Sequence, residues 1–140
     1  MSCCSNLEAI NSPIEVTIAE KSPIQTQGIH HVSINVKDVE AALEFYLNTL
    51  ALEQLPRPDL GFPGAWLKAG DQEIHLLGID GGSPLKEQHF AFAVADAESV
   101  HATLTAEGFT PSPIRDIPNI CRQFFTHDPS GNMIEFNQRL

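Results

Sequence analysis

The chain has 140 residues, of which 42% are hydrophobic and 19% are charged, a balance typical of one globular domain and not of a disordered chain. Eighteen acidic and eight basic residues give a formal net charge of −10, and such a charge repels a nucleic acid backbone and an anionic lipid surface. No apolar run approaches the roughly 20 residues that cross a bilayer, and the N-terminus lacks a secretory signal pattern. We therefore expect a cytoplasmic protein that binds neither nucleic acid nor membrane.

The N-terminal residues differ in composition from the remainder of the chain. Residues 1–27 combine Ser, Asn, Pro and Gln with only short apolar pieces, which predicts a flexible N-terminal arm. Two of the three cysteines, Cys3 and Cys4, are adjacent in this arm, and the third is Cys121. An odd number without metal-type spacing favours reduced thiols. The functional part is expected to be a single domain over residues 28–140.

Residues 28–79 predict a first module of strand, helix and three strands. The stretch HHVSINV alternates like a strand, and Asp38 can cap the helix VEAALEFYLNTL, whose apolar side chains share one face. That face is formed by Val39, Ala42, Leu43, Tyr46, Leu47 and Leu50. Three short strands are expected over residues 52–57, 65–69 and 73–77, separated by Pro and Gly.

Residues 86–140 repeat the same order of signals. HFAFAV predicts a strand, Asp96 can cap the next helix, and Gly108 closes it. Strands are expected near residues 110–115, 121–126 and 133–137, and Asp128-Pro129-Ser130-Gly131 is predicted to be a turn before the last of them. The fold class is therefore α+β, with two βαβββ modules whose curved mixed sheets enclose a shared cleft.

Aligning the two modules places His31 opposite His89 and His75 opposite Glu135. Because side chains alternate across a strand, all four are expected on the face directed away from the helices, where a common cleft would bring them together. Two or three imidazoles and one carboxylate suit one divalent ion of Zn, Ni, Co, Mn or Fe, and open coordination positions make the site catalytic. For His75, direct binding and a hydrogen-bonding role beside the ligands both remain open.

Other side chains are candidates for substrate contact. Ser33 and Asn35 share the cleft face with His31. Trp66, Phe124 and Phe125 are packing residues or, if they face the cleft, line an apolar pocket; Trp66 and Phe124 are included among the candidate substrate contacts. Arg122 is a candidate anchor for a substrate carboxylate. Three histidines are expected to have structural roles only: His30, His101 and His127.

Four segments resemble the vicinal oxygen chelate superfamily, which includes glyoxalases, bleomycin resistance proteins and extradiol dioxygenases. They are GIHHVSINVKDVEAALEFYLNTLAL, QEIHLLG, QHFAFAVADAESVHATLTAEGF and RQFFTHDPSGNMIEFNQ, and they span residues 28–138. The most specific pieces are H-V-x-I-x-V with its F-Y helix and D-P-x-G-N-x-I-E. The resemblance implies a metal held by His31, His89 and Glu135, with a further ligand at the position of His75. Glyoxalase I normally has Glu there as a proton-shuttling base, so His75 departs from that pattern.

The resemblance implies a metal-dependent lyase or isomerase of glyoxalase-like type, acting on a small substrate with vicinal oxygens or on its thiol adduct. The metal would act as a Lewis acid, and Glu135 would also carry a proton. Two alternatives stay open: an Fe(II) extradiol ring-cleaving dioxygenase, and a metal-silent protein that binds a small molecule such as a drug. Many relatives dimerise, some completing the site across chains, so we expect a homodimer.

Overall fold

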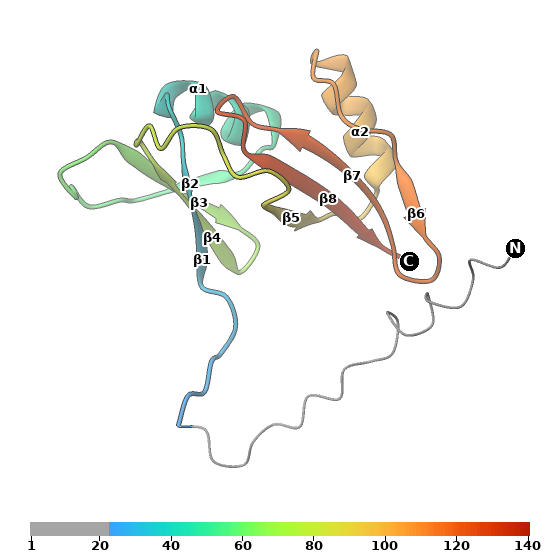
Figure 1. Cartoon of the computed structure of the whole chain (residues 1–140), viewed down its shortest axis with the longest axis horizontal. Coiled ribbons are helices and arrows are strands. Elements are labelled where there is room, and N and C mark those ends of the chain that lie inside the picture. Colours follow the sequence, from blue (N-terminus) through green and yellow to red (C-terminus); the bar gives the residue numbers. More distant parts are fainter. Residues whose placement is uncertain (1–22) are drawn as a thin grey trace, which may run out of the picture.

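Two four-stranded mixed sheets lie side by side in the computed structural model, which describes residues 23–140 (Figure 1). The first sheet has the order β1-β4-β3-β2. Its strands are β1 (His31–Asn35), β2 (Glu53–Leu55), β3 (Gly64–Ala69) and β4 (Gln72–Leu77). Strands β1 and β4 are parallel, and the other neighbours are antiparallel. Cys3, Cys4 and all but the last five residues of the predicted arm lie outside the described residues.

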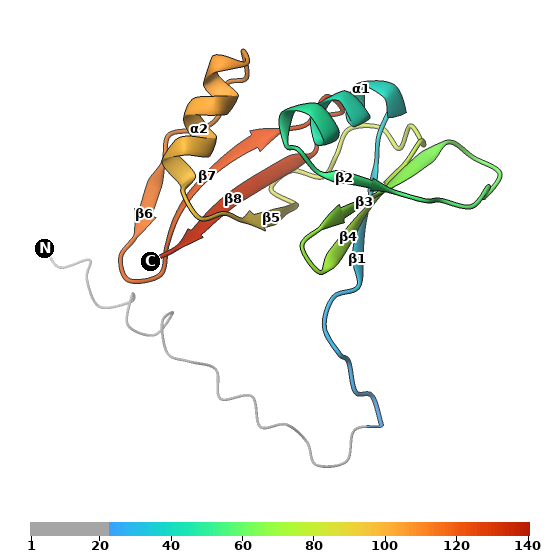
Figure 2. The ribbon, with the colours of Figure 1, turned by 180° about the vertical axis from the view of Figure 1, so that it is seen from behind.

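The second sheet repeats this topology in the order β5-β8-β7-β6. Its strands are β5 (His89–Ala93), β6 (Arg115–Ile117), β7 (Cys121–His127) and β8 (Met133–Arg139). Helix α2 (Ala97–Ala106) follows β5, and the Asp96 side chain accepts hydrogen bonds from its first turn. Figure 2 shows from behind that both modules carry their helices on the same side. The predicted α+β fold of two βαβββ modules is confirmed.

The first helix is less regular than its sequence pattern predicts. Asp38 caps α1 (Val39–Leu43) as expected, but the helix continues as the π-helical segment η1 (Glu44–Thr49). The amide of Leu50 donates to the carbonyl of Phe45, an i to i+5 bond that widens the last turn. Phe45 and Tyr46 are both buried as a result. The regular 3.6-residue period had placed only Tyr46 on the apolar face.

Two strand predictions need correction. The strand expected over residues 110–115 lies later in the chain, at β6. Pro111 and Pro113 lack amide hydrogens, and Ser112 between them bonds Phe125 instead of continuing a ladder. The strand expected over residues 52–57 is confined to Glu53–Leu55, because Pro56 and Pro58 interrupt it. Within residues 23–140, no helix is long and apolar enough to cross a membrane.

The turn before β8 joins the two modules through hydrogen bonds, of which the one between Tyr46 and Asp128 is buried. The hydroxyl of Tyr46 donates to Asp128 Oδ2 at 2.8 Å, and the amide of Lys37 donates to Ser130 Oγ at 2.9 Å. Asn132 Nδ2 donates both to the carbonyl of Asn35 and to Asp128. Burial, with the negative charge of Asp128, raises the pKa of the Tyr46 phenol above its usual range. We call these contacts the module junction. The predicted turn is confirmed, and the sequence pattern did not predict its hydrogen bonds to the first module.

Candidate metal centre

The first candidate ligand pair lies on the second sheet, where β5 and β8 run parallel. His89 Nε2 is 3.9 Å from Glu135 Oε1. The other ring nitrogen, Nδ1, is 2.8 Å from the carbonyl oxygen of Glu87. Because a carbonyl only accepts, Nδ1 donates this bond, and in the neutral imidazole Nε2 then keeps its lone pair. This is the tautomer that a metal ligand needs, and the lone pair lies on the nitrogen nearer the carboxylate.

The second pair lies on the first sheet, where β1 and β4 are neighbours. The rings of His31 and His75 stack with centroids 4.0 Å apart, and Trp66 stacks on His75 at 4.6 Å. His75 is buried, and its Nε2 is 2.7 Å from Glu73 Oε2. The hydrogen bond from His75 lowers the pKa of Glu73. His75 is thus held on one nitrogen and between two rings, which fixes its orientation.

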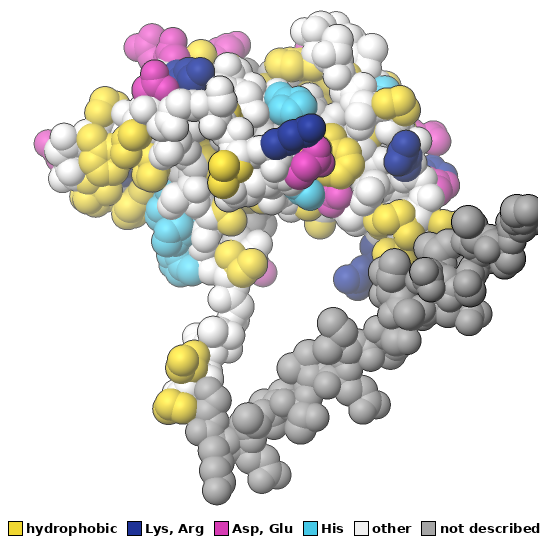
Figure 3. All heavy atoms as spheres, viewed as in Figure 1, with side chains coloured by type: hydrophobic (Ala, Val, Ile, Leu, Met, Phe, Trp, Pro, Cys, Tyr) yellow, Lys and Arg dark blue, Asp and Glu magenta, His cyan; other side chains and the backbone are white. Residues whose placement is uncertain are grey.

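The exposed end of the first sheet is rich in histidine. His31 Nδ1 lies 2.9 Å from His30 Nδ1, so one of these nitrogens donates to the other. Figure 3 shows the histidine side chains gathered there, with hydrophobic side chains over the β2–β3 loop beside them. His101, by contrast, bonds the carbonyl of Ser112, and His127 is exposed at the end of β7. Within residues 23–140, neither of these two histidines forms a hydrogen bond with a candidate ligand.

The two ligand pairs are not united within one copy of the chain. Among residues 23–140, no group of three or more His, Cys, Asp or Glu side chains is placed to hold a metal ion. The sequence pattern had predicted that the two modules would bring all four ligands together. They do not, because the modules meet at the module junction, whereas β1 and β5 each form an edge of a separate sheet. The structure therefore holds two separate pairs of candidate ligands.

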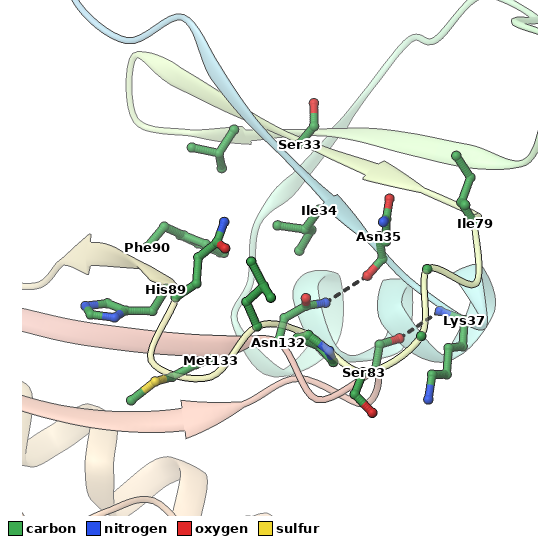
Figure 4. A pocket seen from close by; sticks show the side chains of 17 residues that line it. Ser33, Ile34, Asn35, Lys37, Ile79, Ser83, His89, Phe90, Asn132 and Met133 are labelled. Atoms are coloured by element: carbon green, nitrogen blue, oxygen red, sulfur yellow. Dashed lines mark hydrogen bonds between the residues drawn. The ribbon is translucent and has the colours of Figure 1, made fainter.

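A groove of about 550 Å³ separates the edges of β1 and β5. Ser33 and Asn35 line it from the first sheet, His89 from the second, and Asn132 lies between them (Figure 4). The 79–85 connection closes one side of the groove. Ser33 and Asn35 thus lie where the sequence pattern placed them, on the solvent-exposed face of β1.

Two predicted substrate contacts lie on the face of β7 that is directed away from the cleft. Phe124 is fully buried and stacks on Phe136. Arg122 lies two residues earlier on the same face of β7, and Asp116 holds its guanidinium at 2.7 and 3.0 Å. Both predictions were wrong, because β7 pairs Phe125 and not Phe124 with Glu135. Phe125 is the aromatic residue on the cleft face, and its ring contacts His89 edge-on at 5.2 Å.

Comparison with known proteins agrees with the fold. The model of the Glyoxalase/Bleomycin resistance protein/Dioxygenase superfamily matches residues 28–136. The chain is 29% identical over 125 residues to Glyoxylase I 4 of Arabidopsis thaliana, covering 81% of this chain and 72% of that protein. The chain belongs to this superfamily of vicinal oxygen chelate proteins, which includes enzymes such as lactoylglutathione lyase.

Solved structures show the same architecture. A structure from Bacillus anthracis described as a glyoxalase family protein is 30% identical, with a TM-score of 0.77 over 85% of this chain and 100% of that chain. Lactoylglutathione lyase from Agrobacterium tumefaciens has a TM-score of 0.68 over 81% of this chain and 94% of that one, at 20% identity. The second likeness concerns the fold alone.

Proposed function

We propose that this protein is a metal-dependent lyase or isomerase of glyoxalase-like type, with one divalent cation bound by His31, His89 and Glu135. The pairing of His89 with Glu135 carries the proposal. Two atoms bound to one tetrahedral ion at about 2.1 Å each lie roughly 3.4 Å apart, and the observed separation of 3.9 Å needs only a small side-chain adjustment to reach that distance. The donor set of imidazoles and one carboxylate suits Zn, Ni, Co, Mn or Fe.

A homodimer is proposed to complete this site. Strands β1 and β5 lie at sheet edges, and within residues 23–140 neither has a neighbour on its outer side. Unpaired edges of this kind favour pairing with a second chain. If the β1 edge of one copy meets the β5 edge of the second, a two-fold axis forms the contact twice. His31 of one copy would then lie beside the His89–Glu135 pair of the other.

We assign His75 a positioning role. Its Nε2 is held by Glu73, and its ring lies between Trp66 and His31. The stack is proposed to fix the plane of the His31 imidazole, as hydrogen-bonded neighbours of metal ligands commonly do.

The proposed substrate is a small molecule with two vicinal oxygens, or its thiol adduct. A bound divalent ion supplies Lewis acidity that stabilises negative charge on those oxygens. Glu135 is the carboxylate proposed to move the proton, Ser33 and Asn35 orient the substrate, and Trp66 lines an apolar part of the cleft. The same ligand set also suits Fe(II)-dependent ring cleavage, and an activity assay can distinguish that reaction from lyase or isomerase activity.

Protein purified without chelator or added metal should contain about one divalent ion per chain by elemental analysis. With Zn, Ni, Co or Mn it should isomerise the hemithioacetal of methylglyoxal and glutathione, or a related thiol adduct. A control sample with Fe(II), oxygen and catechols should form no coloured ring-cleavage product. Coloured product would assign the dioxygenase reaction instead. Failure of any divalent ion to bind would contradict metal dependence and favour a small-molecule binding protein.

A further inference from the structure

Arg57 is an arginine that no sequence motif singled out, and it follows β2 in the loop to β3. Its Nη2 donates to the carbonyl of Phe62 at 3.1 Å. The guanidinium carbon lies 4.9 Å from the centroid of the Phe62 ring, a cation–π distance. These two contacts hold the guanidinium in one place beside the loop.

The guanidinium lies over Gly64, at the start of β3. A Cβ on Gly64 would come within 2.9 Å of Arg57 Nη2, so the absence of a side chain there makes room for it. Gly64 and Trp66 are two residues apart on β3 and share a face, and Trp66 pairs with His75. The guanidinium is therefore on the face that carries His75, displaced along the strand by roughly 7 Å.

Arg57 lacks the acidic partner that a partly buried guanidinium usually has. Within residues 23–140, Arg57 makes no ion pair, and its Nε is a buried donor without a hydrogen-bond partner. Arg122, in contrast, is paired with Asp116 and Glu98. This occurs in a chain with 18 acidic residues. The Arg57 side chain as a whole is only partly buried, and no acidic side chain within residues 23–140 pairs with it. The positive charge of its guanidinium is therefore open to an anion from outside the chain.

We propose that Arg57 binds an anionic group at the far end of the substrate, so that the substrate class is small organic anions, foremost carboxylates. The vicinal oxygens would lie by the stacked histidines and the second acidic group roughly 7 Å along the sheet. A planar guanidinium binds a carboxylate through two parallel hydrogen bonds. The position of the vicinal oxygens rests on the proposed metal function, whereas binding of the anion by Arg57 does not.

Two probes that differ only in the distal group test this proposal. They are 2-hydroxyglutarate and 2-hydroxypentanoate, which share the vicinal oxygens and the five-carbon chain. Calorimetric titration of the metal-loaded full chain should show at least about tenfold tighter binding of 2-hydroxyglutarate. The preference should disappear in Arg57→Gln and be reduced in Arg57→Lys. It should persist in Arg122→Gln, the matched control, with metal content equal in all four proteins.

A second readout separates failure of this proposal from failure of the metal function. Glutarate, which has no hydroxyl to chelate a metal, should shift the NMR signal of the Arg57 Nε–H group in metal-free protein, and Arg57→Gln should remove that signal. No shift with glutarate, or a preference for 2-hydroxyglutarate that survives in Arg57→Gln, would overturn the role of Arg57. Absence of bound metal together with a glutarate shift would overturn only the metal function. Should Arg57→Gln fail to fold, a reduced preference in Arg57→Lys supports the role and an unchanged one overturns it.

Discussion

Asp128→Ala is expected to lower the free energy of unfolding by about 3–5 kcal/mol, measured by urea denaturation. The Asp128 carboxylate is 5% exposed and accepts hydrogen bonds from Tyr46, from the amides of Ser130 and Asn132, and from the Asn132 side chain. Its removal leaves several buried donors without a partner, each of which is unfavourable. The same change removes the bond between Tyr46 and the second module, so the modules should separate more readily.

Two further variants provide reference values for the loss of unfolding free energy in Asp128→Ala. Tyr46→Phe removes a single bond to the carboxylate and should cost about 1.5–3 kcal/mol. Asp80→Ala is the matched control, because Asp80 is exposed and accepts one backbone bond from Gly82; its effect should stay within about 0.5 kcal/mol. If Asp128→Ala were no more harmful than Asp80→Ala, the module junction would not hold the modules together.

Glu135→Gln and His89→Ala are expected to weaken binding of the divalent ion by at least about 100-fold. Even residues that only support a metal ligand commonly contribute 10- to 100-fold to affinity, and the loss of a direct ligand should exceed that range. The measurement is competition with a chromophoric chelator, read as the dissociation constant for Zn. His75→Phe preserves the ring stack and should weaken affinity less than either of these changes.

The matched controls are an exposed carboxylate and an exposed imidazole away from the site. Glu40→Gln, in α1, and His127→Ala, at the end of β7, should leave the dissociation constant unchanged within about twofold. Equal losses in these controls would point to nonspecific binding by an acidic protein. Unchanged affinity in Glu135→Gln would remove Glu135 from the ligand set.

Local sequence signals were sufficient for much of the fold. Asp38 and Asp96 cap their helices as the pattern indicates, because a cap requires only a short polar side chain before an apolar period. The strict alternation around His31 and His89 likewise placed both imidazoles on exposed strand faces. Such features depend on residues within a few positions of one another, which one sequence contains in full.

Longer-range features were beyond those signals. The face of Phe124 depends on the register of β7 against β8, and a shift by one residue exchanges the two faces of a strand. The π-helical turn at Phe45 depends on packing, since its bond to Leu50 widens an otherwise regular pattern. The placement of the two modules depends on the bonds of Tyr46 to Asp128 and of Lys37 to Ser130, and the partners of these bonds are 82 and 93 positions apart in the chain. An alignment of the two modules shows which positions are equivalent. It does not show whether the side chains at those positions meet within one copy of the chain.

The most direct test is a mixed dimer of two variants with different affinity tags, one carrying His31→Ala and the other Glu135→Ala. Each variant alone should bind no ion tightly. If modules from two copies form each site, the purified mixed dimer contains one site with both mutations and one with neither, and should bind one ion per dimer with the affinity of the unmodified protein. A mixed dimer that binds no ion, or an unmodified chain that binds its ion as a monomer, would contradict a site shared between copies.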